Sequence, residues 1–437
     1  MNEIEDRRAR LSVEKRALLE KRLKGLSAAA ATPATEARPA AEPAPGIDAA
    51  AAALDAGFAS ELSPGAVPPV NREVWRAMVE AGLREAGTRA VARDLVADAA
   101  YEPQHDAQSA AFLSAAFQQL GVFQQAGEKR TIAGVIADCK VLPKYEKVLR
   151  RWMIALTEEG LLEREGQDVY VARQPVPTPA LDALMTGEQR TYYAENLAAV
   201  LTGDTHPLEF YLPGGSSASV EASYTETPIF RYCNGISAAV MEAQARLLPP
   251  GARLRMLEIG AGTGGTTKSL LPLLPADRTV FLFTDVSKFF TDLSRKRLHA
   301  YTFVRYRELD IEIDPVPQGF PAGSFDWIVA AHVLHATRNV EETLRHVLRL
   351  LAPGGVLLLL EETRFQRKYN FSMGFLPGFD HFEDYDRRPL HPLLSTAKWR
   401  EALLTAGFVD FATFTQPGSA ADVLGVDVML ARAAGGF

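Results

Sequence analysis

The chain has 437 residues, 23% of them charged and 47% hydrophobic, which is ordinary for a globular protein of two or three domains. Its formal net charge of −7 argues against a nucleic-acid-binding protein, because such proteins usually carry an excess of Lys and Arg. With only Cys139 and Cys233, the chain has neither a disulfide framework nor a cysteine-rich zinc cluster. It shows no secretory signal and no apolar run of roughly 20 residues, so we expect a cytoplasmic protein that does not contact membranes.

Residues 1–25 are predicted to form a helix that docks on another protein. Leucines recur there at near-helical spacing among many Arg and Lys residues. A solvated helix without a partner is an equal alternative, although a helix this short is marginal alone in water. Residues 26–53 are rich in Ala and Pro and contain few large apolar side chains, so we interpret them as a linker.

Residues 54–205 are predicted to form a mostly helical domain that acts as a lid. Two successive helices and a short hairpin between residues 131 and 171 resemble a winged helix. A winged helix can bind DNA, but the glutamates around its second helix argue against that alternative. Residues 206–250 are expected to bridge this domain to residues 251–437.

The last domain alternates apolar strand patterns with helical patterns, which predicts an α/β fold with a parallel sheet and crossover helices. Such a doubly wound, Rossmann-like sheet binds its ligand at the carboxyl ends of the strands. The strands are expected at residues 254–259, 279–284, 303–309, 325–330, 356–360, 409–414 and 427–431.

The most informative segment is MLEIGAGTGGTT at residues 256–267, which predicts a strand, a tight loop and a helix. Gly260, Gly262 and Gly264 let the backbone pass close to a ligand, and the following helix offers free N–H groups to it. A tight turn without a ligand is the alternative. The position of Glu258 before the first glycine resembles the first motif of class I S-adenosylmethionine (SAM) methyltransferases, which implies that these four residues bind SAM.

Further cofactor contacts are expected at the ends of the next strands. Asp285 ends the second strand, where a carboxylate accepts hydrogen bonds from ribose hydroxyls; a helix N-cap is its alternative role. Asp310 closes the third strand and is expected to accept from the adenine amino group, with Ile311 covering the ring. Ala331 and His332 close the fourth strand, where the methionine end of SAM would lie.

A histidine and a carboxylate follow neighbouring strands and are predicted to act together. His335 comes just after the fourth strand, and Glu361 ends the strand at residues 356–360. A carboxylate in reach of the imidazole would fix its tautomer and stabilise the imidazolium formed when it abstracts a proton. A structural histidine is the alternative. We predict no metal site, because the other His and acidic residues near 381–391 lack ligand spacing.

The segment from Leu257 to Trp399 is similar to methyltransferase domains of modular polyketide synthases and polyketide–peptide hybrids, and looser similarity extends over residues 100–430. The resemblance implies that His335 and Glu361 form a catalytic dyad and that the substrate is an acyl chain tethered by phosphopantetheine to an acyl carrier protein. It also makes an upstream synthase subunit the expected partner of the N-terminal helix. The motifs that carry the resemblance are LEIGAGTGGTT (257–267), FTDVS (283–287), VLHATR (333–338), LAPGG (351–355) and RPLHPLLS (388–395).

Two departures from the family bear on the reaction. Carbon-methylating members often carry tryptophans where this chain has Phe379 and Asp380, and Asn where it has His332. We therefore expect the substrate pocket to include Phe379, Asp380 and Tyr224, and we favour O-methylation of a β-hydroxyl. C-methylation of the α-carbon of a β-ketoacyl thioester is the alternative, and a non-catalytic or winged-helix binding module is the alternative of another class.

Overall fold

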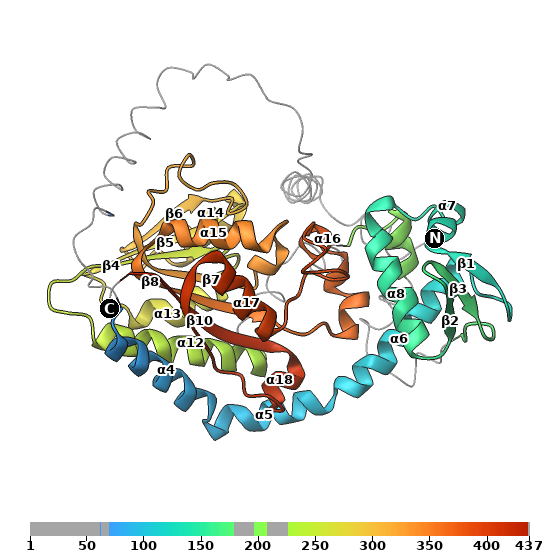
Figure 1. Ribbon diagram of the computed structural model, residues 1–437, viewed down its shortest axis with the longest axis horizontal. Coiled ribbons are helices and arrows are strands. Elements are labelled where there is room, and N and C mark those ends of the chain that lie inside the picture. The colour runs from blue at the N-terminus through green and yellow to red at the C-terminus, as the bar shows by residue number, and fades with distance from the viewer. Residues whose placement is uncertain (1–61, 63–69, 179–195, 208–225, 436–437) are drawn as a thin grey trace, which may run out of the picture.

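The computed structural model describes residues 62, 70–178, 196–207 and 226–435. The described chain forms two bodies, a sheet covered by helices and a smaller helical body, which a line of helices connects (Figure 1). The expected docking helix and linker, residues 1–53, lie outside the described residues. No helix among the described residues is both long enough and apolar enough to cross a membrane.

The larger body contains a seven-stranded sheet with the order β6-β5-β4-β7-β8-β10-β9. The five strands from β6 to β8 are parallel, as expected, whereas β10 runs antiparallel to both β8 and β9. The predicted strands are therefore confirmed in position, and the last one lies between β8 and β9 with reversed direction. The strands are β4 (Leu254–Ile259), β5 (Thr279–Asp285), β6 (Val304–Glu308), β7 (Phe325–Ala331), β8 (Leu351–Glu362), β9 (Phe408–Thr413) and β10 (Val426–Ala433).

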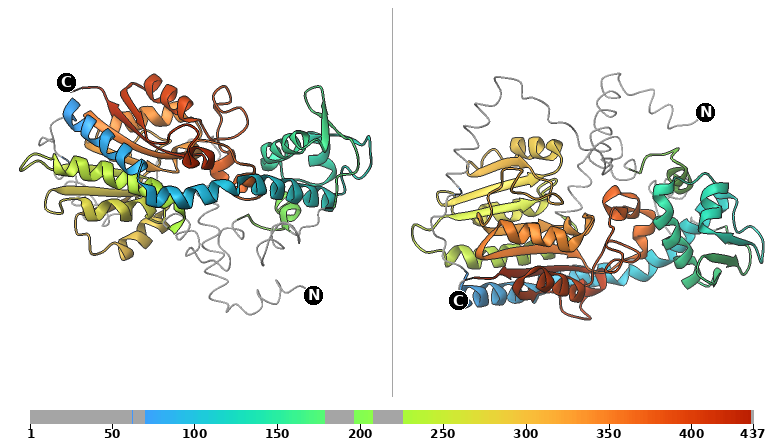
Figure 2. Two further views of the ribbon diagram at one scale, coloured as in Figure 1. Left: turned by 90° about the horizontal axis from the view of Figure 1, so that it is seen from below. Right: turned by 45° about the horizontal axis from the view of Figure 1, so that its top comes forward.

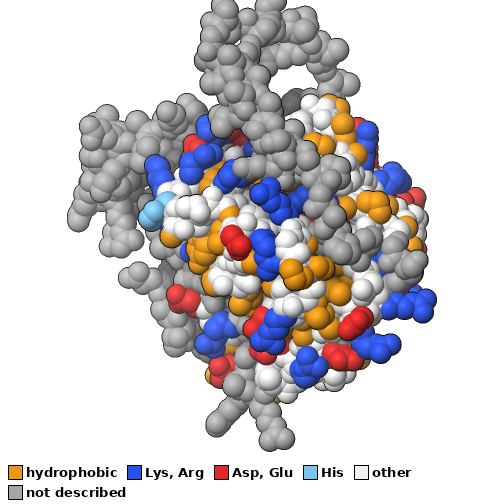
Figure 3. Space-filling model, turned by 90° about the vertical axis from the view of Figure 1, so that its left-hand side faces the viewer, with side chains coloured by type: hydrophobic (Ala, Val, Ile, Leu, Met, Phe, Trp, Pro, Cys, Tyr) orange, Lys and Arg blue, Asp and Glu red, His pale blue; other side chains and the backbone are white. Residues whose placement is uncertain are grey.

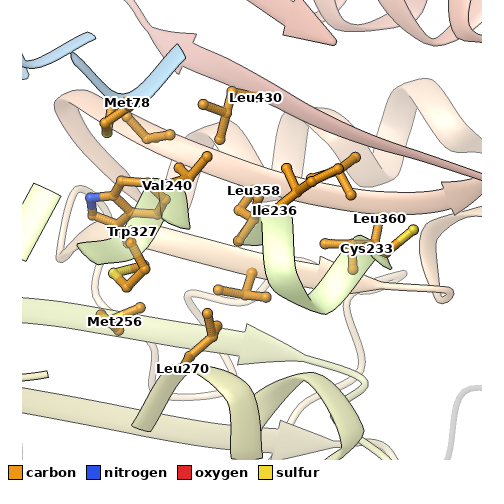
Figure 4. Packing of buried hydrophobic residues seen from close by; sticks show 14 of the residues in the cluster. Met78, Cys233, Ile236, Val240, Met256, Leu270, Trp327, Leu358, Leu360 and Leu430 are labelled. Carbon is orange, nitrogen blue, oxygen red and sulfur yellow. The ribbon is translucent and has the colours of Figure 1, made fainter. Parts of the chain in front are cut away.

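Helices cover both faces of this sheet, which explains why its central strands are apolar without alternation. Every residue of β4 and β5 is buried. On one face, α12 contributes Ile236 and Val240, which pack against Trp327 and Leu358 of the strands (Figure 4). The helices of the larger body are α12 (Pro228–Arg246), α13 (Gly265–Leu270), α14 (Lys288–Arg297), α15 (Val340–Leu350), α16 (Pro377–Asp380), α17 (Thr396–Ala406) and α18 (Ala420–Leu424), with the 3₁₀ turns η4 (Leu271–Leu273) and η5 (Leu334–Ala336). Two further 3₁₀ segments after β8, η6 (Arg367–Phe371) and η7 (Met373–Phe375), contribute Phe371 and Phe375 to the core of the smaller body.

Two N-terminal helices belong to the larger body. Helix α4 (Arg72–Ala86) packs along α12, and α5 (Arg89–Ala100) packs against α12 and α18. Met78 and Leu95, buried in these helices, join the core cluster of the sheet. The domain predicted at residues 54–205 therefore contributes to both bodies. Its first helices bury apolar side chains in the core of the larger body, and its described part from α6 onward belongs to the smaller body.

The smaller body has the predicted winged-helix order. It begins with the long helix α6 (Glu102–Leu120), which runs away from the sheet (Figure 2). Its three strands form a small sheet in the order β1-β3-β2, and Trp152 and Phe117 meet edge to face in its core. The remaining elements are β1 (Lys129–Thr131), α7 (Ile132–Asp138), η1 (Pro143–Tyr145), α8 (Glu146–Glu158), β2 (Leu162–Glu165) and β3 (Val169–Ala172).

The basic side chains of α8 make contacts within the chain. Arg150 pairs with Asp168 at 2.9 Å, and Lys147 donates to the carbonyl oxygens of Asp380 and Phe382 at 2.7 and 3.0 Å. Arg151 is buried and pairs with Asp380 at 2.8 Å. The helix that would read DNA in a winged helix is thus used here to hold the segment after β8. On the opposite end of the molecule, acidic, basic and apolar side chains are interspersed (Figure 3).

Candidate active site and cofactor site

The glycine loop between β4 and α13 has the backbone shape that the sequence predicts. Gly260, Gly262 and Gly264 all have positive φ, at 58°, 54° and 78°, a region that glycine adopts without strain. A Cβ atom at Gly260 would lie 2.3 Å from Cγ2 of Val333, so this glycine is required for close packing. At Gly262 the space is open, with the nearest atom, the carbonyl oxygen of Gly260, at 3.9 Å. Gly262 therefore leaves room for a ligand at the loop.

Asp285, at the end of β5, faces this loop. Its carboxylate accepts hydrogen bonds from the backbone N–H groups of Gly262 at 2.9 Å and Ser287 at 2.8 Å. Burial raises the pKa of Asp285, and these two hydrogen bonds oppose the rise. A carboxylate has about four acceptor positions, so lone pairs remain for ribose hydroxyls. The position fits the predicted ribose contact.

Glu258 lies one layer deeper, at the end of β4. It is 1% exposed, and its carboxyl group accepts a hydrogen bond from the Thr267 hydroxyl at the start of α13. Burial, with the nearby charge of Asp285, raises the pKa of Glu258 to about 8 although Thr267 opposes the rise. In this position Glu258 holds the start of α13, the helix that follows the glycine loop. Its direct contact with SAM stays a prediction.

The remaining predicted cofactor residues lie at the same edge of the sheet. Asp310 follows β6 and accepts from the backbone N–H of Glu312 at 3.0 Å. Ile311 is buried in the core cluster on the α15 face of the sheet. Ala331 ends β7, next to β4 in the sheet. The predicted residues after β4, β5, β6 and β7 thus lie at one edge of the sheet, and their contacts with SAM, including the cover of the adenine by Ile311, stay predictions.

His335 and Glu361 contact each other, as predicted from the neighbouring ends of β7 and β8. The imidazole Nδ1 of His335 is hydrogen-bonded to Oε2 of Glu361, and both side chains are buried. Since an ionised carboxylate only accepts, Nδ1 carries the hydrogen and Nε2 is left as the basic nitrogen. Burial opposes the charged imidazole, but the Glu361 carboxylate outweighs burial and raises the pKa of His335.

The other oxygen of Glu361 fixes the turn that carries His335. Oε1 accepts from the backbone N–H groups of Leu334 at 2.8 Å and of Val333 and His335, both at 3.3 Å. The carboxylate therefore orients both the imidazole ring and the backbone of η5. This arrangement gives one histidine nitrogen the properties of a general base.

A second histidine–glutamate pair adjoins the first and was missed from the sequence. His332 Nδ1 lies 2.8 Å from Oε2 of Glu362, and the His332 ring meets Phe230 edge to face. His332 has a φ of 55°, an unusual backbone conformation for a residue other than glycine. Burial would raise the pKa of Glu362, but His332 and then His335 lower it to about 2. The only sequence signal for this pair is the doubled Glu at the end of β8.

Ligand atoms of His335, Glu361 and Glu362 lie within 4.8 Å of one another, a spacing that a metal ion could bridge. The hydrogen bond to Glu361 already uses Nδ1 of His335, the nitrogen nearest both carboxylates. We therefore interpret the cluster as a proton-transfer site, and the absence of a metal stays a prediction.

The residues predicted for the substrate pocket are only partly placed. Phe379 packs against Phe365 and Tyr369 with ring-centroid distances of 6.2 and 5.8 Å, and the following Asp380 pairs with Arg151. The Asp380 carboxylate is thus engaged with the smaller body, and its contact with substrate stays a prediction. Tyr224 lies outside the described residues.

Comparisons with known proteins bear on this site. A family model described as "Methyltransferase domain" matches residues 257–357. The highly reducing polyketide synthase rstn3 of Aspergillus nomiae is 36% identical over 259 residues, which are 58% of this chain and 10% of that protein. The chain spans about a tenth of the length of the curated relatives it matches.

Solved structures match over most of the chain. The CurJ carbon methyltransferase is 30% identical with a TM-score of 0.75, over 83% of this chain and 98% of that one. The chain belongs to the methyltransferase domains of polyketide synthases. The methyltransferase (CMeT) domain of the citrinin polyketide synthase is 26% identical with a TM-score of 0.69, over 85% and 100% of the two chains. The trans-methyltransferase CalH, solved with S-adenosylhomocysteine, is 27% identical with a TM-score of 0.54, over 76% and 92%.

This membership makes the chain a SAM-dependent methyltransferase of class I, with the expected Rossmann-like sheet and helical region. SAM is its cofactor, and the open space at Gly262 and the carboxylate of Asp285 fit a nucleoside at the glycine loop. When bound there, SAM would supply an electrophilic methyl group.

Proposed function

We propose that this domain methylates the α-carbon of a β-ketoacyl chain that an acyl carrier protein presents through phosphopantetheine. The observation that carries the proposal is the buried pair of His335 and Glu361 beside the cofactor edge of the sheet. The pair leaves one basic nitrogen, Nε2, and a carboxylate that stabilises the imidazolium after proton transfer.

In the proposed reaction, His335 accepts a proton and Glu361 stabilises the charge that forms on its ring. His335 Nε2 takes the α-proton, and the electron pair of the broken C–H bond forms the new bond to the methyl carbon. The sulfur–methyl bond of SAM would break in the same step, and its electron pair would stay on sulfur in the neutral thioether product. The Glu361 carboxylate accepts from Nδ1 throughout, so the positive charge on the ring is paired while it exists. The proton then passes from His335 to solvent.

This proposal replaces the O-methylation expected from the sequence. That expectation rests on His332 and Phe379, which differ from the residues of carbon-methylating members. The solved structures that the chain resembles include the CurJ carbon methyltransferase, which supports the carbon alternative. The chemistry supports it as well, since a proton between two carbonyl groups is far more acidic than an alcohol proton. A histidine base is therefore better matched to the carbon acid.

The carrier-bound substrate follows from the relatives. The curated matches are polyketide synthases, which this chain resembles over a tenth of their length. A domain of this family is expected to take its acyl chain from a carrier protein. The upstream synthase subunit proposed as the partner of residues 1–25 likewise rests on the resemblance to polyketide synthases.

The reaction is tested with two carrier-protein thioesters, acetoacetyl and 3-hydroxybutyryl, and SAM with an isotopically labelled methyl group. We expect the acetoacetyl chain to gain a methyl group on carbon, which NMR distinguishes from a methoxy group. The hydroxybutyryl chain should remain unmethylated. A methyl ether on the hydroxybutyryl chain, with no product from acetoacetyl, would overturn the carbon assignment in favour of O-methylation.

A further inference from the structure

Glu361 binds the N–H groups of the turn that carries His335, and a different residue, Arg388, binds its carbonyl oxygens. Arg388 lies in the segment between α16 and α17 and is 1% exposed. Its Nη1 donates to the carbonyl oxygen of His335 at 2.8 Å, and its Nη2 donates to those of Thr337 at 2.7 Å and Arg338 at 3.0 Å. One guanidinium group thus binds three carbonyls of the stretch that follows the base.

The charge of this guanidinium is paired within the same segment. Arg388 Nε is hydrogen-bonded to Asp384, whose other oxygen accepts from the backbone N–H of Val340 at 3.2 Å. Val340 begins α15, the helix after the turn. The Arg388–Asp384 pair therefore contacts the backbone both at His335 and at the start of α15.

Glu361 and Arg388 bind the backbone on both sides of His335. Glu361 accepts from N–H groups of residues 333–335, and Arg388 donates to the carbonyls of His335, Thr337 and Arg338. The turn is a single 3₁₀ turn, η5, which has few hydrogen bonds of its own. Two backbone bonds lie within the turn, from Ala336 to Val333 and from Thr337 to Leu334, and the Arg338 N–H donates to Glu312 at 2.6 Å. Glu361 and Arg388 add bonds on either side of His335, and they reach it from β8 and from the segment before α17.

We propose that Arg388 is a positioning residue that holds the His335 turn in the geometry needed for proton abstraction. The proposal rests on the proposed function of His335 as the base. Burying an arginine is costly, and a guanidinium fork bonds several carbonyls at once whereas an ammonium group is a compact donor. The shape of the group, and not only its charge, is therefore what the turn requires.

The charge of Arg388 has a separate, measurable effect. Among the groups around His335, Arg388 lowers the pKa of the imidazole, against the raising effect of Glu361. Arg388→Met removes both the fork and the charge, while Arg388→Lys removes the fork and keeps the charge. The two variants therefore separate geometry from electrostatics.

The test compares kcat, KM for the acetoacetyl carrier thioester, SAM affinity and the pH dependence of kcat. For Arg388→Met we expect a loss of kcat on the order of 10²-fold, because a small misplacement of a catalytic group has that effect. KM and SAM affinity should stay within about twofold of the parent values, and the acidic limb of the pH profile should move to higher pH. Arg388→Lys should lose kcat with the limb unmoved.

The matched control is Arg255→Met. Arg255 is also buried and forks onto a carboxylate, Asp326, at 2.6 and 3.0 Å, but at the opposite end of β4 and β7. Its removal should lower the melting temperature and leave kcat per folded molecule unchanged. A loss of kcat in Arg388→Met no larger than in Arg255→Met would overturn the positioning role. If Arg388→Met does not fold, an unchanged kcat in Arg388→Lys overturns it.

A double variant separates this proposal from the proposed base. Arg388→Met should have no further effect on the residual rate of His335→Ala, because a positioning residue acts only through the group it positions. Additive losses would overturn the positioning role alone. Full turnover by His335→Ala would instead overturn the base assignment, on which the positioning role depends.

Discussion

At the scale of single residues, the reaction should follow the ionisation of His335. The base must be neutral to accept a proton, and the Glu361 carboxylate raises its pKa despite burial. We therefore expect kcat to fall as pH drops through a value above 6.5, the ordinary value for histidine. In Glu361→Gln this acidic limb should move to lower pH, because the charge that stabilises the imidazolium is gone. An unmoved limb would mean that the titrating group is not His335.

The magnitude of the loss tests the same residue independently. His335→Ala should lower kcat by about 10²–10⁴-fold, the usual contribution of a general base. SAM affinity, measured by calorimetry, should stay near the parent value because no SAM contact is assigned to His335. Turnover near the parent rate would move the base elsewhere, with His332 as the first candidate.

Glu258 links the stability of the cofactor-free protein to pH. Its folded pKa of about 8 lies above the unfolded value of about 4.3, so the folded state holds a proton that the unfolded state releases. The stabilisation is complete below about pH 4.3 and is lost as pH rises toward 8. Glu258→Gln cannot ionise and should lack this dependence. Denaturant unfolding from pH 5 to 8 checks it, and parallel curves for the two proteins would contradict the assignment.

The contact between His335 and Glu361 could be predicted from the sequence because it follows a local rule. His335 and Glu361 follow adjacent parallel strands, whose carboxyl ends meet at one edge of the sheet. The contacts of Arg388 could not be predicted in this way. They depend on how the long segment after β8 folds back on η5. No residue spacing in the sequence predicts that this segment contacts η5.

At the scale of elements, the glycine loop provides a matched pair of substitutions. Gly262 and Gly251 both have positive φ, at 54° and 79°, and both have open space where the Cβ of another residue would lie. Alanine should destabilise the protein by roughly 1–2 kcal/mol at either position, from backbone strain alone. Only Gly262→Ala should also weaken SAM binding, because its side chain enters the proposed ligand space. Equal SAM affinity in the two variants would show that the ligand does not approach Gly262.

The strands were the most predictable elements and their direction the least. Runs of mostly apolar residues located the central strands β4, β5, β7 and β8, whereas the edge strands β6 and β9 include charged residues. The reversed direction of β10 has no local signature, since a buried strand reads the same either way. Similarly, the stripe on α4 indicated a helix but not that it packs on α12 of the larger body.

At the scale of the whole molecule, the segment after β8 contacts both the smaller body and the turn that carries His335. Arg151 of α8 donates to Asp380 and to the carbonyl oxygen of Gly374, and Trp152 donates to that of Asn370 at 2.9 Å. The same segment continues to Arg388, which binds the His335 turn. The smaller body is therefore connected through a few polar contacts to the group proposed as the base.

The position of Leu62 sets a limit on how much of the N-terminus can be removed. Leu62 is 1% exposed, belongs to the core cluster of Leu257 and Phe325, and its carbonyl oxygen accepts from Arg255 at 3.3 Å. A chain that begins at residue 54 keeps these contacts and should melt at the parent temperature. A chain that begins at residue 70 loses them and should be less stable by about 2–5 kcal/mol, the usual cost of emptying a buried leucine site.

Leu62→Ala in the full chain is the control that separates the side chain from the missing backbone. It should reproduce most of the loss seen in the shorter truncated chain, because the apolar contacts carry most of the stabilisation. The chain from residue 54 should also methylate a carrier-bound acyl chain at the parent rate, since residues 1–25 are proposed to dock on a partner and residues 26–53 to be a linker. Loss of folding in that chain, measured by thermal unfolding, would show instead that residues 1–53 pack on the larger body.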